Sequence, residues 1–223
     1  MTKSGEKSKW AFPLGLAIVL LAVVGLVFIV LLSVDGIQKI TDNGKQKKSY
    51  EAFLLPIVMN DPNTFDDVTQ ADMGQLLDST IWSLIKKNVE TDKYDYFEDK
   101  LLVPQKDVEK QFAKMFGKDV KPKHQTVNGS EYQFEYDESK QAYKIPVFGM
   151  ENTYTPKVLK IDKKSSSIVL TVGYISGSEW TQDEHGKMVE PDPSKYVKIT
   201  LRTKGNSNYV SAIQATDPPE KLK

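Results

Sequence analysis

The chain has 223 residues, a length that favours one folded unit with additional segments over two full domains. Its 30 basic residues balance its 30 acidic residues, so it lacks both the positive excess typical of nucleic-acid-binding proteins and the one-sided charge of a disordered tail. Cysteine is absent, which excludes disulfides, thiolate metal sites, iron–sulfur clusters, thiol catalysis and lipid attachment through cysteine.

An uncharged and strongly apolar segment occupies residues 11–34. Its 24 residues would extend about 36 Å as an α-helix, enough to cross a hydrocarbon core of about 30 Å. A cleavable signal peptide is the alternative, but this run is longer than a signal-peptide core and no small-x-small cleavage motif follows it. The sequence therefore predicts a membrane anchor that contacts the lipid bilayer through residues 11–34.

The residues on either side of this segment predict its orientation. A short flank that carries lysines tends to stay in the cytoplasm, so we expect residues 1–10 to be a short cytoplasmic end. Residues 35–48 are polar and lysine-rich, and we expect a juxtamembrane linker or a helical extension there. The predicted location is the bacterial cell (inner) membrane, crossed once, with the C-terminal domain outside. The predicted anchors at the membrane interface are Trp10, Phe12, Lys7 and Lys9.

Residues 49–216 are predicted to form the extracytoplasmic domain, followed by a tail at 217–223. Its first half shows the three- and four-residue spacing of apolar side chains that is typical of amphipathic helices. The first predicted helix is bent or interrupted at Pro56, and the third begins at Pro104 and stops at Gly117. The predicted helices cover residues 50–58, 69–89 and 104–116.

After residue 123 the pattern changes from helical spacing to alternation, which is typical of half-buried strands. Helices followed by a run of antiparallel strands indicate an α+β class. We therefore expect one N-terminal transmembrane helix, then about three helices packed on a curved antiparallel sheet of five to six strands. The predicted strands cover residues 132–136, 142–147, 158–161, 168–175, 196–203 and 208–216.

This order of elements, together with the closing strand Tyr209-Val210-Ser211-Ala212-Ile213, resembles the cone-shaped superfamily of nuclear transport factor two. The resemblance covers roughly residues 49–216 and is carried by no motif residue. A membrane anchor followed by such a domain is similar to the inner-membrane assembly factors of type IV secretion and to conjugation proteins of Gram-positive plasmids. The resemblance implies a scaffold that binds membrane or envelope proteins.

Residues 176–195 separate two strong strand patterns and form an acidic segment with aromatic and apolar residues among polar neighbours. A connection of this length is usually functional or disordered. One interpretation is a loop that anchors a protein partner; the other is a long hairpin with its turn at residues 184–187. The candidate partner-binding residues are Trp180, Asp183, Glu184, His185 and Met188.

Aromatic residues in the predicted strands are a second candidate site. Alternate residues of a strand face the same side, so they could line a cavity inside a curved sheet that takes a small molecule or a cell-wall or lipid fragment. The same side chains are also ordinary half-buried strand residues. The candidate cavity-lining residues are Tyr132, Phe134, Tyr136, Tyr143 and Tyr174.

The residues available for catalysis are few. His124 and His185 lie in loop-like stretches, where we expect solvated side chains that are poorly placed for a catalytic triad. No phosphate-binding loop, dinucleotide fingerprint, nucleophile elbow or zinc motif occurs. The sequence therefore predicts a non-catalytic interaction module without cofactor, metal or nucleic acid, with small-molecule binding as the alternative and a hydrolase or isomerase of the cone-shaped superfamily as the less favoured one.

Overall fold

The computed structural model describes residues 43–91, 93–129, 131–146, 153–205 and 207–219. The chain divides into two compact units, Met1–Gln46 and Lys47–Lys223. The predicted membrane segment 11–34 and its interfacial anchors Trp10, Phe12, Lys7 and Lys9 lie outside the described residues. Within the described residues no helix is both long enough and apolar enough to cross a membrane.

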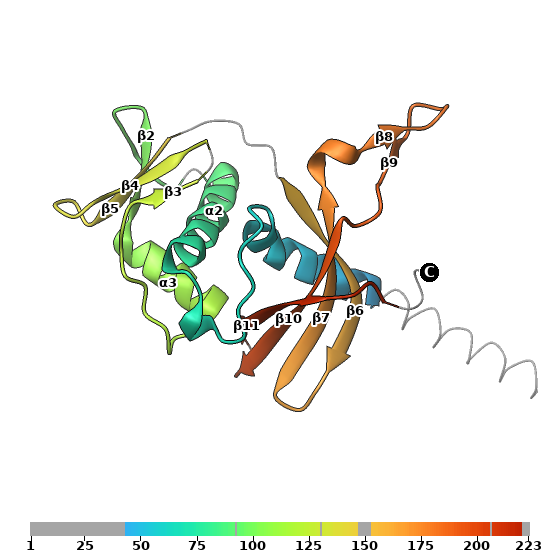
Figure 1. Ribbon diagram of the computed structural model, residues 1–223. Coiled ribbons are helices and arrows are strands. Elements are labelled where there is room, and N and C mark those ends of the chain that lie inside the picture. The colour runs from blue at the N-terminus through green and yellow to red at the C-terminus, as the bar shows by residue number, and fades with distance from the viewer. Residues whose placement is uncertain (1–42, 92, 130, 147–152, 206, 220–223) are drawn as a thin grey trace, which may run out of the picture. The chain divides into compact units, whose positions relative to one another are not determined.

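The second unit is an α+β fold in which three α-helices pack with antiparallel sheets (Figure 1). The first helix covers residues 43–58 and belongs to this unit from Lys47 onward; it is followed by α2 (Met73–Thr91) and α3 (Gln105–Phe116). The α+β class predicted from the order of the patterns is therefore confirmed.

The helix at residues 43–58 includes the last residues of the stretch predicted as a linker or helical extension. It continues through Pro56, so of the two predicted alternatives, a bend or an interruption, the interruption is wrong. Proline removes one intrahelical hydrogen bond, but Leu54 and Ile57 on either side of it are fully buried, and packing of this kind supplies most of a helix's stability. The Glu51 carboxylate accepts a hydrogen bond of 2.8 Å from the Val158 backbone N–H, which ties the helix to a strand.

Helix α2 begins at Met73, four residues later than predicted. The reason is two successive aspartate caps. The Asp67 side chain accepts from the Thr69 N–H and caps a single 3-10 turn, Val68–Gln70. The Asp72 side chain then accepts from the Gln75 N–H at 2.9 Å and caps α2 itself.

Helix α3 follows Pro104 directly and ends at Gly117, as predicted. Gly117 has a φ of 88°, a region that side chains other than glycine rarely adopt. A Cβ atom there would also lie 2.9 Å from the Tyr209 ring, so a larger residue would be strained in two ways.

Four long strands form one antiparallel sheet in the order β11-β10-β7-β6. Their bounds are β6 (Tyr154–Lys163), β7 (Ser167–Ser176), β10 (Lys195–Lys204) and β11 (Ser207–Thr216). In β10 the buried residues Val197, Ile199 and Leu201 alternate with more exposed ones, which is the pattern that predicted the strand.

Five of the remaining strands form a second sheet in the order β1-β2-β5-β4-β3, so the prediction of one curved sheet is wrong. The unpredicted strand β2 pairs with one edge of β5 while β4 pairs with the other, which leaves β5 no free edge for β6. The bounds are β1 (Tyr96–Phe97), β2 (Lys100–Pro104), β3 (Val127–Asn128), β4 (Gln133–Asp137) and β5 (Ala142–Pro146).

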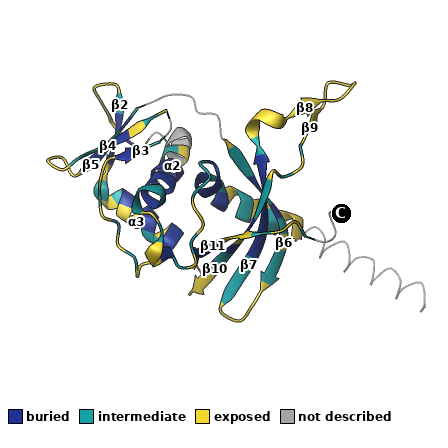
Figure 2. Cartoon of the chain, in the orientation of Figure 1, coloured by how far each residue is buried: buried dark blue, intermediate teal, exposed yellow. Residues whose placement is uncertain are grey.

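Buried side chains from all three helices and both sheets form one hydrophobic core. Helix α3 contacts α2, strand β2 of one sheet and strand β11 of the other. Figure 2 shows the buried residues along α2 and the strands of the four-stranded sheet, and the exposed surface of the hairpin formed by β8 (Thr181–Gln182) and β9 (Met188–Val189). The core lies within the second unit, which therefore contains the apolar contacts that its fold requires.

Candidate functional site

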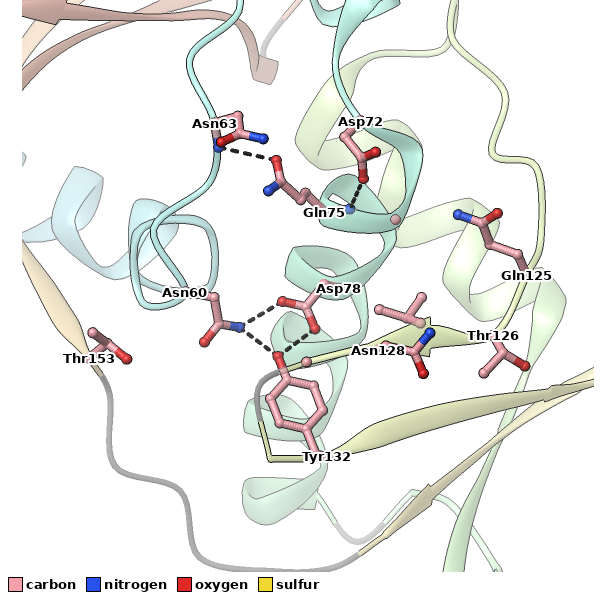
Figure 3. Close-up of a pocket in the computed structure, with 13 residues that line it drawn as sticks. Asn60, Asn63, Asp72, Gln75, Asp78, Gln125, Thr126, Asn128, Tyr132 and Thr153 are labelled. Atoms are coloured by element: carbon pink, nitrogen blue, oxygen red, sulfur yellow. Dashed lines mark hydrogen bonds between the residues drawn. The ribbon is translucent and has the colours of Figure 1, made fainter.

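A polar cleft of about 620 Å³ lies beside the first turns of α2. Its other walls are the loop that follows the first helix, the segment that leads into β3, and the turn between β3 and β4 (Figure 3). The elements that meet here are far apart in the sequence, and Asp72, whose side chain caps α2, is one of the lining residues. The cleft falls within the range of about 300–1,000 Å³ that small-ligand sites occupy.

Asp78 on α2 is the centre of a hydrogen-bond network in this cleft. The Tyr132 hydroxyl donates to Asp78 Oδ1 at 2.7 Å, and Asn60 Nδ2 donates to Asp78 Oδ2 at 2.6 Å. Asn60 Nδ2 also donates to the Tyr132 oxygen at 2.9 Å, which closes the triangle seen in Figure 3. Trp82, one turn further along α2, donates its indole N–H to the same oxygen at 3.0 Å. Both carboxylate oxygens are therefore engaged, and Tyr132 is held from two sides.

The environment of Asp78 shifts its proton affinity. The residue is only 8% exposed. Burial raises the pKa of its carboxyl above the ordinary value of 3.8, and the hydrogen bonds that it accepts oppose part of that rise. Burial and the nearby Asp78 charge also raise the pKa of the Tyr132 hydroxyl, which therefore keeps its proton and donates it. The pair is thus set with tyrosine as donor and aspartate as acceptor.

Gly129, in the turn between β3 and β4, allows Tyr132 to reach Asp78. A Cβ atom at this position would lie 2.2 Å from the Tyr132 ring, a distance that no side chain could adopt without moving the ring. The Gly129 N–H also donates to the Tyr132 carbonyl at 2.9 Å, which closes the turn. A glycine is therefore required here by close approach of the ring.

Three further polar side chains line the cleft without a bond to the described part of the chain: Asn63, Gln125 and Thr153. Gln75 is different, because its side-chain oxygen accepts from the Asn63 backbone N–H at 3.1 Å. Among the described residues that line the cleft there are two carboxylates and no lysine, arginine or histidine. The cleft therefore offers amide donors and acceptors in a negative field.

Of the five aromatic residues predicted to line a cavity, only Tyr132 borders this cleft. Phe134 and Tyr143 are fully buried in the core, and the Tyr136 hydroxyl donates to Gln105. Tyr174 lies in the other sheet, fully buried, and its hydroxyl has no hydrogen-bond partner among the described residues. The structure therefore does not gather the five rings around one cavity.

The two histidines have different environments. His185 is exposed at the tip of the hairpin, as predicted. His124 has a side chain that is only 9% exposed, which contradicts the prediction that it is solvated. Its Nδ1 lies 3.0 Å from the Tyr143 hydroxyl and its ring stacks on Tyr136 with centroids 5.3 Å apart. His124 thus packs from its irregular segment against the five-stranded sheet, with Nε2 3.3 Å from Oε1 of Glu109 on α3, and it lies outside the cleft.

The acidic segment at residues 176–195 forms a hairpin, as one of its two interpretations predicted. Thr181 pairs with Val189 and Gln182 with Met188. The turn is held by Asp183, whose side chain accepts from two backbone N–H groups, those of His185 and Lys187, at 2.9 Å each. Glu184 is exposed in the turn, and Trp180 and Met188 are 37% and 50% exposed. The candidate binding residues are thus all at the surface.

Replacing Asp78 with asparagine is expected to remove a pH dependence of stability. Between pH 3.8 and the raised native-state pKa, the unfolded chain releases the Asp78 proton while the native chain keeps it, so the stability contributed by this group falls as the pH rises. The asparagine variant does not titrate. The free energy of unfolding of the native chain relative to Asp78→Asn should therefore decrease in urea titrations as the pH rises above about 4, and it should level off above the raised native-state pKa.

Asp192→Asn is the matched control, because Asp192 is an exposed carboxyl outside the cleft. The same measurements on this variant should show no such decrease. A stability difference for Asp78→Asn that stays constant or increases with pH would contradict the prediction.

Sequence reasoning missed Asn60, Asp78 and Gln125. One signal was present: Asp78 follows Leu77 of the apolar stripe and lies four residues before Trp82, so a carboxylate is placed next to a buried helix face.

Within the described residues, no three histidine, aspartate or glutamate side chains are grouped closely enough to hold a metal ion. Comparison of the chain with models of protein families, with curated proteins and with solved structures finds no significant match.

Proposed function

We propose that this chain is a single-pass bacterial membrane protein whose extracytoplasmic α+β domain is a non-catalytic module that binds another envelope protein. The uncharged segment at residues 11–34 supports the anchor. The scaffold role rests on the resemblance of the sequence pattern to type IV secretion assembly factors, whereas the structure has two separate sheets in place of one curved sheet. The hairpin β8–β9 is the contact surface in this proposal.

The exposed apolar side chains of the hairpin carry the proposal. Five large hydrophobic residues are exposed among the described residues. Three of them lie on this hairpin: Trp180, Met188 and Val189. The other two are Tyr96 and Phe97 on β1. Tryptophan and methionine are enriched in protein interfaces, where an aromatic anchor surrounded by polar residues supplies much of the binding energy. The five acidic and two basic residues of the segment 176–195 favour a partner with a basic rim.

The double variant Trp180→Ala, Met188→Ala is expected to weaken partner binding at least tenfold without unfolding the domain, since both residues are exposed. The measurement is the amount of each membrane protein that co-purifies with the full chain after cross-linking in native membranes. The matched control is Tyr96→Ala, Phe97→Ala, which removes the other two exposed hydrophobic residues. Partners that are recovered equally with the hairpin variant, or a monomer without partners, would contradict the proposal.

Binding of a small molecule in the cleft is the second candidate, and Asp78 favours it. A buried carboxyl with a raised pKa beside a tyrosine is an arrangement common at functional sites. A hydrolase or isomerase would use the same group as a general acid or base. Both oxygens of Asp78 are already engaged by hydrogen bonds, which supports a binding role over proton transfer.

A further inference from the structure

We propose that the cleft beside α2 binds a neutral saccharide. This inference rests on the ligand-binding candidate of the proposed function and names its ligand class. Four properties of the cleft lead to it: the sign of its charge, its small number of apolar side chains, its amides without a partner among the described residues, and its fixed floor.

The charge of the lining selects against anions. Asp72 and Asp78 border the cleft, and no cationic side chain is among its described lining residues. A phosphate, sulfate or carboxylate ligand would meet repulsion that no positive group offsets. The Asp72 side chain caps α2, while Asp78 is the one carboxylate at the buried floor. A ligand therefore needs no negative charge, and it can donate a second hydrogen bond to an Asp78 oxygen.

The lining also lacks the apolar surface that a lipid or a hydrophobic ligand requires. Sites for such ligands are lined mostly by aliphatic and aromatic side chains with few polar groups. Here Val127 is the one aliphatic side chain larger than alanine, and Tyr132 is the one aromatic ring, among the described lining residues. A lipid tail would gain little from burial at this place. This composition separates the cleft from a lipid pocket.

The unengaged side chains match a hydroxyl-rich ligand. Asn63, Gln125 and Thr153 come from three different segments and reach the cleft from different sides (Figure 3). An amide presents one acceptor and two donors, and a sugar hydroxyl both donates and accepts, so neighbouring hydroxyls pair with amides. An extended peptide would instead bind along a sheet edge, but the edge strand at this cleft, β3, has only two residues.

The floor of the cleft is already ordered. Asp78, Asn60 and Tyr132 hold one another through three hydrogen bonds of 2.6–2.9 Å. A ligand that binds here does not have to order these groups, which lowers the entropic cost of binding. The Tyr132 ring, fixed against Gly129, gives the floor an apolar face next to polar groups, which suits the mixed surface of a sugar ring.

The test uses the full chain in phosphatidylcholine nanodiscs, free of sugar-based detergents, and measures binding by isothermal titration calorimetry. The probes are maltotetraose, cellotetraose and chitotetraose as neutral saccharides, a heparin-derived tetrasaccharide as an anion, and spermidine as a cation. We expect at least one neutral tetrasaccharide to bind. Its affinity should fall about fivefold in Gln125→Ala and in Asn63→Ala, the loss of one neutral hydrogen bond each.

Gln70→Ala is the matched control, since Gln70 is an exposed amide outside the lining, and it should leave the affinity unchanged. Asp78→Asn should weaken saccharide binding about tenfold. If this variant unfolds, Gln125→Ala and Asn63→Ala still test the proposal. No binding of any neutral saccharide, equal binding in Gln125→Ala and Asn63→Ala, or tighter binding of the heparin fragment would overturn the proposal. If spermidine is the only probe that binds, and its binding is lost in Asp78→Asn, the cleft is a ligand site but the proposal of a saccharide ligand is overturned.

Discussion

Replacing Phe112 with alanine is expected to lower the free energy of unfolding by about 3–5 kcal/mol. Phe112 lies on α3, is fully buried and packs against Phe116 with ring centroids 5.2 Å apart. Helix α3 contacts both sheets, so the cavity would open where they share one core. Because domains are stable by only about 5–15 kcal/mol, this loss should bring the domain close to unfolding.

Urea denaturation followed by circular dichroism measures the effect of this substitution. Phe97→Ala is the matched control, because it removes the same side chain from an exposed position, and it should change the free energy of unfolding by less than about 1 kcal/mol. A loss in Phe112→Ala no larger than in Phe97→Ala would show that α3 does not hold the core together.

The second large effect is expected for Gly173→Ala. Gly173 lies in β7, an inner strand paired with both β6 and β10. A Cβ atom there would lie 2.6 Å from Cγ and 2.7 Å from Cβ of Pro193. Neither the proline ring nor the inner strand moves easily, so the substitution should lower the free energy of unfolding by about 1–3 kcal/mol.

Two further variants test this explanation. Combining Gly173→Ala with Pro193→Gly removes both atoms that would clash, Cγ and Cβ, so in the Pro193→Gly background Gly173→Ala should cost little of the free energy of unfolding. Gly44→Ala adds the same methyl group to a helix with nothing within 4 Å, and it should stabilise the chain by about 0.5–1 kcal/mol. Additive losses in the double variant would mean that the strain has another source.

The Pro193 contact also matters for the proposed interaction surface. Pro193 lies at the base of the hairpin, and the next residue, Ser194, donates its N–H to the Tyr174 carbonyl at 2.9 Å. These contacts hold the end of the hairpin against β7. We infer that position 173 is a glycine because the segment that contains Pro193 passes very close to β7 just before β10 begins.

The elements that the sequence predicted correctly are those whose signal is local. Helix α3 has a proline before it, a glycine after it and an apolar stripe between them. Strand β7 is mostly apolar from Ile168 to Ile175, and β10 alternates buried with more exposed residues from Val197 to Leu201. In such segments the side-chain pattern alone distinguishes buried from exposed faces, so no knowledge of distant residues is needed.

The elements that were missed depend on pairing with distant residues. Strand β2 follows a polar, aspartate-rich stretch, and its strand conformation is stabilised by pairing with β5, where Lys100 lies opposite Pro146. Strands β1 and β3 have two residues each, too few to show any period. This hidden pairing is why two sheets form where one was expected.

By itself, the sequence determined the α+β class, the placement of the long helices and strands, and a membrane-length apolar segment, because each follows from the order and spacing of side chains along the chain. The position and the lining of the cleft follow only from the tertiary structure. Asn60 and Tyr132 are 72 residues apart, yet they bond to each other and to the same carboxylate. No spacing rule connects residues so far apart, since their meeting depends on how helices and sheets pack.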